Sequence, residues 1–201
     1  MCQDQSRVNA QVFTKNERIK MKNGITKNTI VKADNIFDPF EHLNTFYEYT
    51  LKITDDEINQ VLFLVKSANT NFQKSTYKSL NVLNFPVLKN LREQIINILN
   101  THKMFLGINW AQLYNKKDEH GLHNHRPAFY SGIIYLKGKN PSPTIFYSSH
   151  LEPYIYNFKR NTLLMFPADI PHEVKPLNKN EERLIISFNT SDCVDNCIVP
   201  A

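Results

Sequence analysis

The sequence lacks any apolar run long enough to cross a membrane. No stretch approaches the roughly 18 consecutive apolar residues that a membrane-spanning helix needs, and the first 24 residues contain no apolar segment of the signal-peptide type. We therefore expect a soluble protein that stays in the cytoplasm where it is made, which is the cytoplasm of the host cell if a phage encodes the chain.

Cysteine is scarce as well. Three cysteines occur in 201 residues: Cys2 near the start, and Cys193 and Cys197 in the segment "SDCVDNCIVP". An odd number of cysteines without a secretion signal argues against a scaffold held by disulfides. A Cys-x3-Cys pair can supply two metal ligands, but a packed or exposed pair of thiols is the commoner meaning, and the sequence assigns these two cysteines no role.

A clustered stripe of positive charge is also missing. The net charge is +5, from 24 basic and 19 acidic residues, which would suit an anionic partner. The lysines are scattered along the chain, whereas nucleic-acid-binding proteins usually show a clustered stripe or a recognisable module. A basic soluble surface is the simpler interpretation, and nucleic-acid binding stays open on the ground of charge alone.

The length favours a single domain, which we predict to span residues 1–201. Residues 1–28 carry little hydrophobic periodicity and are expected to be flexible, and 29–103 are expected to form a helical support region that opens with a strand at 28–34. A capping box at Thr54–Glu57 predicts the start of one helix, which continues with apolar residues at helical spacing. A second helix is predicted at 86–101, with Pro86 in its first turn.

After Lys103 the sequence changes to short β-type runs separated by turn-like segments such as "KGKNPSP". Seven such runs in fewer than 90 residues predict an antiparallel sandwich or barrel. The fold class is therefore α+β, with helices first, a β-rich core at 104–190 and a tail at 191–201. The runs lie at 104–115, 128–136, 143–149, 154–158, 162–167, 172–177 and 183–189.

Three histidines are candidate metal ligands. His123 and His125 lie two residues apart, so on a strand both side chains would point to the same face. His172 opens a later run, 49 residues after His123. Two ligands early in a β-fold and a lone histidine late in it are a common way to build a non-haem iron site. The alternative for each of the three is a polar residue at the end of a strand.

Arg183 is a candidate anion-binding residue, eleven residues after His172 in the run "RLIISFN". An arginine in a hydrophobic strand is costly to bury without a carboxylate partner, and its planar guanidinium suits bidentate binding of a carboxylate. Ser187 faces the same side by strand parity and can add a hydroxyl donor. The alternative is an ion pair with Glu181 or Glu182, which lie in the preceding turn and do not readily follow an arginine that points inward.

These pieces, in the order "HNH", "SGIIYL", "LLMFPADIPHEV" and "RLIISFN", resemble the Fe(II)/2-oxoglutarate-dependent oxygenases. The chain looks most similar to small bacterial and phage-type members that have an "SGxxYL" strand after the first ligands, and the resemblance covers about 104–190. It implies N-terminal helices packed on a double-stranded β-helix, a barrel of the jelly-roll or cupin type. It also implies hydroxylation of an unidentified substrate with Fe(II), with 2-oxoglutarate and O2 as cosubstrates, and with release of succinate and CO2.

The resemblance implies a role for particular residues. His123 and His172 match iron ligands, and Arg183 matches the arginine that binds the distal carboxylate of 2-oxoglutarate, with Ser187 as a helper. Tyr135 falls where such enzymes often place a tyrosine on that carboxylate. Tyr114, nine residues before His123, falls on the strand that often supplies a cosubstrate contact. Both tyrosines have an alternative meaning, because aromatic residues on strands are most often packing residues.

The chain departs from the family pattern at the second ligand. An Asp or Glu usually stands two residues after the first histidine, and His125 stands there in this sequence. A three-histidine site carries one negative charge less than a site with two histidines and a carboxylate. This difference changes how iron binds and changes its redox behaviour. His125 itself, a nearby acid such as Asp118 or Glu119, or a water or anion could complete the site. We favour His125 because its offset is correct.

Two other functions remain open. One is a cupin-type three-histidine metal enzyme that does not use 2-oxoglutarate, although it gives Arg183 and Ser187 no role. The other is a catalytically inactive binding domain of the same fold. Lysines and acids mixed in the loops at 115–122 and 137–143 mildly favour an anionic or polymeric substrate, but the sequence reveals neither the substrate nor the oligomeric state. Of the four histidines outside the candidate site, His120 is expected to matter most; His42, His102 and His150 are expected on the surface or in packing.

Overall fold

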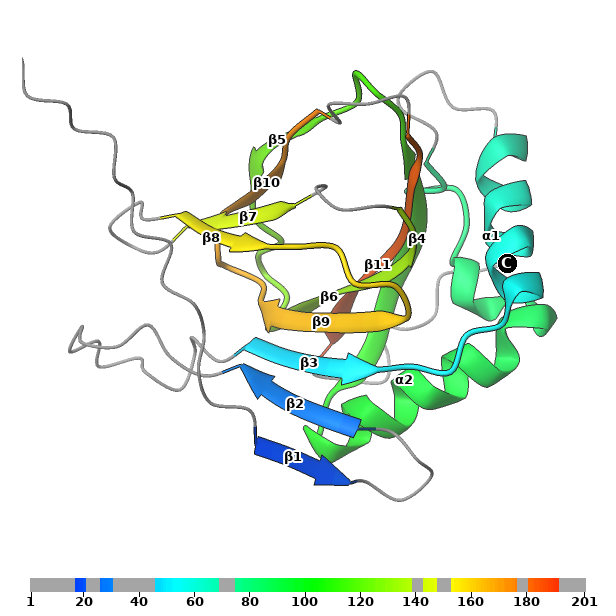
Figure 1. Cartoon of the computed structure of the whole chain (residues 1–201). Coiled ribbons are helices and arrows are strands. Elements are labelled where there is room, and N and C mark those ends of the chain that lie inside the picture. The colour runs from blue at the N-terminus through cyan, green and yellow to red at the C-terminus, as the bar shows by residue number, and fades with distance from the viewer. Residues whose placement is uncertain are drawn as a thin grey trace, which may run out of the picture.

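The computed structural model describes residues 17–20, 26–30, 46–68, 75–138, 143–147, 153–176 and 181–191. Two antiparallel sheets face each other, and two helices cover the outer side of the larger sheet (Figure 1). The larger sheet has the strand order β1 (Glu17–Lys20), β2 (Thr26–Ile30), β3 (Phe46–Thr50), β9 (Thr162–Pro167), β6 (Tyr130–Lys137), β11 (Arg183–Ser191) and β4 (Phe105–Tyr114). The smaller sheet has the order β5 (His120–His123), β10 (His172–Val174), β7 (Thr144–Tyr147) and β8 (Pro153–Tyr156).

Both predicted helices are present. The helix α1 (Asp55–Ser67) begins with the predicted capping box: the amide of Glu57 donates to Oγ1 of Thr54 at 3.2 Å, and the amide of Thr54 donates to the Glu57 carboxylate at 2.8 Å. The second helix begins later than predicted, because Pro86–Leu88 forms the 3-10 turn η3 and α2 covers Lys89–Thr101. Another 3-10 turn, η2 (Val82–Asn84), precedes it.

All seven predicted β-runs contain a strand: β4 and β6–β11. The predicted strand at 28–34 overlaps β2, and its residues beyond Ile30 lie outside the described part of the chain. Three strands were missed, namely β1, β3 and β5. The sequence of β5, "HGLH", has no β-branched residue and no Phe, Tyr or Trp, so its conformation comes from pairing with β10 rather than from local preference.

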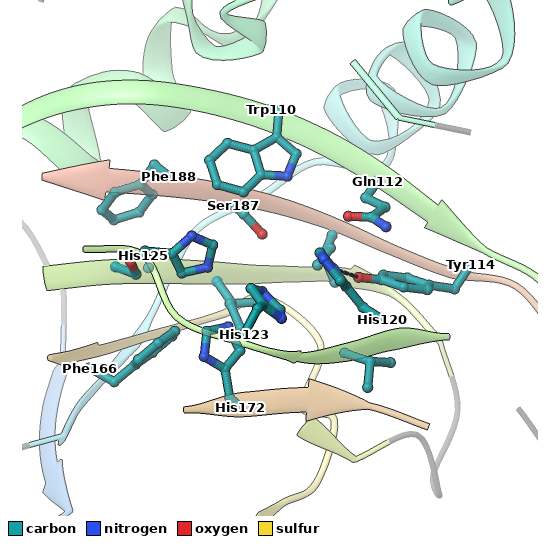
Figure 2. Close-up of a pocket in the computed structure, with 15 residues that line it drawn as sticks. Trp110, Gln112, Tyr114, His120, His123, His125, Phe166, His172, Ser187 and Phe188 are labelled. Carbon is teal, nitrogen blue, oxygen red and sulfur yellow. Dashed lines mark hydrogen bonds between the residues drawn. The ribbon is translucent and has the colours of Figure 1, made fainter. Parts of the chain in front are cut away.

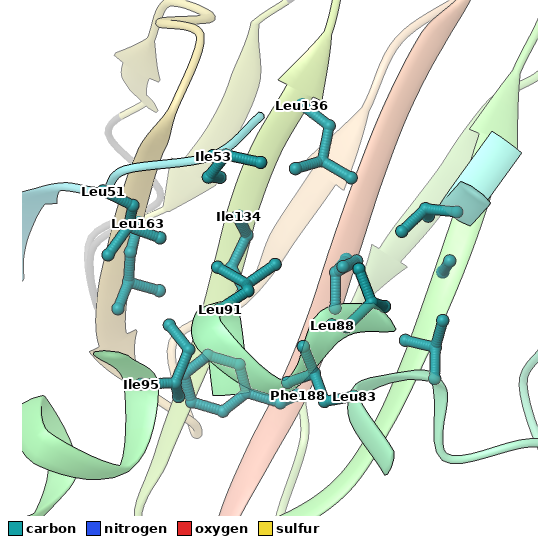
Figure 3. Close-up of a cluster of buried hydrophobic side chains, with 14 of the residues drawn as sticks. Leu51, Ile53, Leu83, Leu88, Leu91, Ile95, Ile134, Leu136, Leu163 and Phe188 are labelled. Atoms are coloured by element: carbon teal, nitrogen blue, oxygen red, sulfur yellow. The ribbon is translucent and has the colours of Figure 1, made fainter. Parts of the chain in front are cut away.

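Strand alternation gives the larger sheet two different apolar faces. Its outer face packs against the helices, where Ile134 and Leu163 meet Leu91 and Ile95 (Figure 3). Its inner face lies opposite the smaller sheet, and a second cluster of buried apolar side chains lies between the two. The candidate site is in this inter-sheet space. The second cluster contains Tyr114, Ile133, Tyr135, Phe146, Phe158, Leu164, Phe166, Val174 and Ile185.

Several sequence features lie outside the described residues, among them all three cysteines, His42 and His150. Among the described histidines, His102 packs as expected, with its ring against Tyr47 and its Nε2 2.5 Å from the Tyr49 hydroxyl. In the described part of the chain, no helix has the length and apolar character that crossing a membrane requires.

Candidate metal centre

The three candidate ligands come together at one end of the inter-sheet space (Figure 2). One potential ligand atom from each of His123, His125 and His172 lies within 4.8 Å of the others. His123 ends β5 and His172 begins β10, where the two are register partners. His125 reaches the group from the loop after β5, and its backbone amide donates to the carbonyl of Ala168 at 2.7 Å. That hydrogen bond ties the loop to the turn between β9 and β10.

The orientation of two imidazoles is fixed by the backbone. Nδ1 of His123 lies 2.7 Å from the carbonyl oxygen of Gly121, and Nδ1 of His172 lies 3.0 Å from that of Ile170. A carbonyl only accepts, so Nδ1–H is the donor in each contact. The proton therefore sits on Nδ1, and Nε2 keeps its lone pair for a metal ion, an arrangement usual for metal-binding histidines.

The histidines are neutral in the ordinary pH range. Burial lowers the pKa of His172 to about 3 and that of His125 to about 4, and the neighbouring imidazoles lower both further. Burial also lowers the pKa of His123. The neutral imidazole is the form that binds metal. Three imidazole nitrogens fit a first-row transition ion such as iron, cobalt, nickel or zinc rather than magnesium or calcium.

The structure places His125, rather than an acidic residue, with His123 and His172. In the described part of the chain, the potential metal-binding group contains these three histidines and no carboxylate. Asp118 instead closes its own turn, because its carboxylate accepts from the backbone amide and the side-chain amide of Asn115 at 2.7 and 3.0 Å.

Arg183 is fully buried further along the inter-sheet space, next to Tyr114 and Tyr135, two of the three residues predicted to accompany it. Its Nη2 donates to Oγ1 of Thr144 at 2.7 Å, and the hydroxyl of Tyr135 lies 3.0 Å from the same Oγ1. The guanidinium carbon lies 5.5 Å from the ring centre of Tyr114 and 5.3 Å from that of Tyr135. Glu182, one alternative partner, pairs instead with Lys137 at 2.7 Å.

Thr144 is the residue that sequence reasoning missed in this arginine group. It begins β7 and is fully buried. Its signal in the sequence is the alternation in "TIFY", where Thr144 shares a face with Phe146. A polar residue on the apolar face of a strand calls for a buried hydrogen-bond partner, and Arg183 with Tyr135 meets that need.

Sheet register sets the separation between the histidine group and the arginine group. His172 pairs with His123 and Phe146, whereas Val174 pairs with His120 and Thr144. The two rows are two residues apart along β10, which corresponds to about 7 Å. Thr144, with Arg183 bonded to it, therefore lies one row away from the histidines.

Ser187 lies with the histidines rather than with Arg183. It is four residues from Arg183 along β11, so the Cα atoms of the two residues are about 13 Å apart in a strand. Ser187 lines the cavity beside the three histidines, and its hydroxyl points toward them (Figure 2). Trp110 and Gln112 of β4 continue this wall of the cavity. Strand parity thus predicted the correct face for Ser187, and its role as a helper of Arg183 stays a prediction.

Comparisons by sequence find nothing: no protein-family model and no curated protein matches the chain. Solved structures do match. AviO1 from Streptomyces viridochromogenes has a TM-score of 0.58 at 10% identity, over 79% of this chain and 93% of that one. The viral collagen prolyl hydroxylase of Paramecium bursaria Chlorella virus-1, in complex with 2-oxoglutarate, has a TM-score of 0.56 at 13% identity, over 72% and 94%.

A third match is HygX from Streptomyces hygroscopicus, solved with nickel and 2-oxoglutarate bound, with a TM-score of 0.56 at 9% identity over 76% of this chain and 84% of that one. At such identities the likeness establishes the fold. This chain has the fold of 2-oxoglutarate oxygenase structures, in agreement with the family that the sequence resembles.

Proposed function

We propose that this protein is an Fe(II)- and 2-oxoglutarate-dependent dioxygenase that hydroxylates a substrate. The observation that carries the proposal is the spacing of two groups on facing sheets: three neutral imidazoles, and a buried arginine one strand row away. The backbone rows that carry the two groups are about 7 Å apart along β10, a spacing that suits a keto acid whose chelating end and terminal carboxylate are joined by two methylenes. A site for a metal alone would need no buried guanidinium at that distance.

The strand order supports the proposal. From β4 to β11 the chain passes back and forth between the sheets, with β4, β6, β9 and β11 in the larger one and β5, β7, β8 and β10 in the smaller one. We propose that these eight strands form the double-stranded β-helix that the resemblance implies, and that β1–β3 extend its larger sheet.

Each group of residues has a separate task. The imidazoles of His123, His125 and His172 would hold Fe(II), and Arg183 and Tyr135 would bind the distal carboxylate of 2-oxoglutarate. When both are bound, the iron and 2-oxoglutarate would supply the chemistry by which O2 oxidises a substrate C–H bond, with release of succinate and CO2. The protein orients these groups and keeps water out.

The apolar residues between the sheets exclude water from the site. Ile133 and Ile185 line the cavity beside the three histidines and are almost fully buried. Apolar walls of this kind strengthen the electrostatic attraction between Arg183 and a bound carboxylate. They also protect a reactive site from side reactions with water.

A three-histidine metal enzyme that does not use 2-oxoglutarate is the second candidate. It is favoured by the donor set, which has no carboxylate among the described residues. It is also favoured by the contacts of Arg183, whose guanidinium already donates to Thr144 and to the carbonyl of Pro143. The loss of metal binding altogether would leave a non-catalytic domain of the same fold.

An anaerobic titration with Fe(II) and then 2-oxoglutarate, followed by visible absorption, separates these functions. We expect a charge-transfer band that requires both components, that is lost in His172→Ala and that needs more 2-oxoglutarate in Arg183→Met. Leu122→Ala, at an exposed position on β5, is the control and should keep the band. Iron binding without a response to 2-oxoglutarate would select the second candidate, and no iron binding would select the non-catalytic domain.

A further inference from the structure

A fourth histidine, His120, lies against the candidate metal centre. Its imidazole stacks on that of His123, with ring centres 3.9 Å apart and planes within 13° of parallel. It does not belong to the group of three histidines whose ligand atoms converge. His120 begins β5 and is half-buried, and it lines the same cavity (Figure 2).

A β-bulge brings His120 to this face. Residues three apart on a regular strand point to opposite sides, so His120 and His123 should not both face the cavity. The β5–β10 ladder is irregular here: His123 pairs with His172 and His120 with Val174, so the three-residue step on β5 matches a two-residue step on β10. Bulges of this kind re-aim a side chain and are over-represented next to active sites.

On its other side, His120 contacts the arginine group. Its Nδ1 lies 3.4 Å from the hydroxyl of Tyr114, and the Tyr114 ring lies against the guanidinium of Arg183. Burial raises the pKa of Tyr114 well above its usual range, so the phenol keeps its proton, and the tautomer of His120 sets which of the two groups donates. His120 therefore connects His123 to Tyr114, and through Tyr114 to Arg183.

We propose that His120 is a positioning residue that holds the His123 imidazole in its metal-binding orientation and links it to the cosubstrate end of the site. The hydrogen bond to the Gly121 carbonyl fixes His123 within its ring plane, and the stacked ring of His120 fixes the tilt of that plane. The contact with Tyr114 holds that phenol beside Arg183. The second of these roles rests on the proposed function, whereas the first needs only a metal.

Two substitutions of His120 separate the stack from the hydrogen bond. His120→Ala removes both, and we expect its Co²⁺ affinity to fall by about tenfold, the lower end of the range for residues that orient a ligand. His120→Phe keeps a flat ring against His123 but has no nitrogen for Tyr114. It should bind Co²⁺ like the wild type and bind 2-oxoglutarate more weakly. The full-length chain, Co²⁺ absorption and calorimetry serve for both measurements.

Tyr114→Phe removes the same hydrogen bond from the other side. It should weaken 2-oxoglutarate binding as much as His120→Phe does, and the double variant should be no weaker than either single one, as expected for two residues that act through one contact. Leu122→Ala, on the same strand and exposed, is the matched control and should change neither affinity.

The outcomes distinguish this proposal from the proposed function. Wild-type Co²⁺ affinity in folded His120→Ala would overturn the positioning role, and loss of Co²⁺ binding in His120→Phe as complete as in His123→Ala would make His120 a ligand instead. Additive losses in the double variant would overturn the link through Tyr114.

If the wild type binds Co²⁺ but not 2-oxoglutarate, the proposed function fails, and the Co²⁺ comparison still tests His120. Should His120→Ala not fold, His120→Gln, which removes the ring, replaces it.

Discussion

His123 and His172 face each other across the β5–β10 ladder, with their Cα atoms in register and their imidazole centres 4.3 Å apart. The pair joins residues separated by 49 positions in the chain. Each imidazole is tied by Nδ1 to a carbonyl two residues before it, at Gly121 or Ile170. The ladder sets the distance and these carbonyls set the tautomer, so a metal ion would meet two ligands already in place.

The first prediction concerns Thr144, whose Oγ1 accepts from Arg183 and contacts the Tyr135 hydroxyl. Thr144→Val preserves the shape of the side chain but leaves a buried guanidinium N–H and a phenol without this partner. We expect the free energy of unfolding to fall by about 1–3 kcal/mol and the affinity for 2-oxoglutarate to change. Urea denaturation and calorimetry measure the two effects.

The control for Thr144→Val is Tyr147→Phe on the same strand, which removes a hydroxyl that donates to Glu173, a carboxylate that keeps a second donor in Lys175. It should cost less stability and leave the affinity for 2-oxoglutarate unchanged. Equal stability of wild type and Thr144→Val would show that Thr144 does not support the arginine group.

The second prediction concerns acid. The lowered pKa values of His172 and His125, about 3 and about 4, mean that the folded protein without metal resists protonation of these imidazoles. In the unfolded chain a histidine titrates near 6.5. Between about pH 6.5 and pH 4 the unfolded state therefore binds more protons, and the free energy of unfolding should fall as the pH falls. His172→Asn, which cannot titrate, should flatten this dependence in urea denaturation. A slope as steep as that of the wild type would contradict the prediction.

The sequence predicted the elements that carry strong local patterns. Strand β9 has the bounds expected from "TLLMFP", because an apolar run of six residues has the length of a buried strand and is too short for a typical helix. The start of α1 was predictable because Thr54 and Glu57 form the capping box through their own side chains. By contrast, β5 has no such pattern and depends on β10, a partner about fifty residues away, which local reasoning does not see.

The sequence predicted most of the residues that form the site, but not how they are arranged. His125 joins the group as expected but for a different reason: β5 ends at His123, so strand parity does not place His125, and the hydrogen bond to Ala168 does. His120 was left outside the site, because only the bulge in the ladder turns it inward. The separation of Ser187 from Arg183 follows from strand length, which parity alone ignores.

The third prediction tests the close packing of β6 against β11. A Cβ on Gly132 would lie 2.2 Å from the Phe188 ring, which is fully buried. Gly132→Ala must displace that ring, and we expect a loss of about 1–3 kcal/mol in the free energy of unfolding. Gly121→Ala is the matched control, since nothing lies within 4 Å of its added Cβ. Equal stability of the two variants in urea denaturation would mean that Phe188 moves without cost.

The last prediction concerns the charge of the metal centre. With three neutral imidazoles, a divalent ion keeps its full charge, whereas His125→Asp replaces one imidazole with a carboxylate and lowers the charge of the centre by one. Carboxylate oxygen suits harder ions than imidazole does, so the variant should gain affinity for Mn²⁺ relative to Co²⁺. The lower charge should also weaken binding of the 2-oxoglutarate dianion to the metal-loaded protein, because a nearby charge acts strongly in a buried site.

The measurements for His125→Asp are Mn²⁺ and Co²⁺ affinities by calorimetry, followed by 2-oxoglutarate titration of each metal-loaded form. His125→Asn is the control, because it has the same size as the aspartate and no charge. If both variants show the same ratio of Mn²⁺ to Co²⁺ affinity, charge at this position does not select the metal. If His125→Asp binds both ions like the wild type, residue 125 is not a ligand, and His123 and His172 hold the ion with water in the third place.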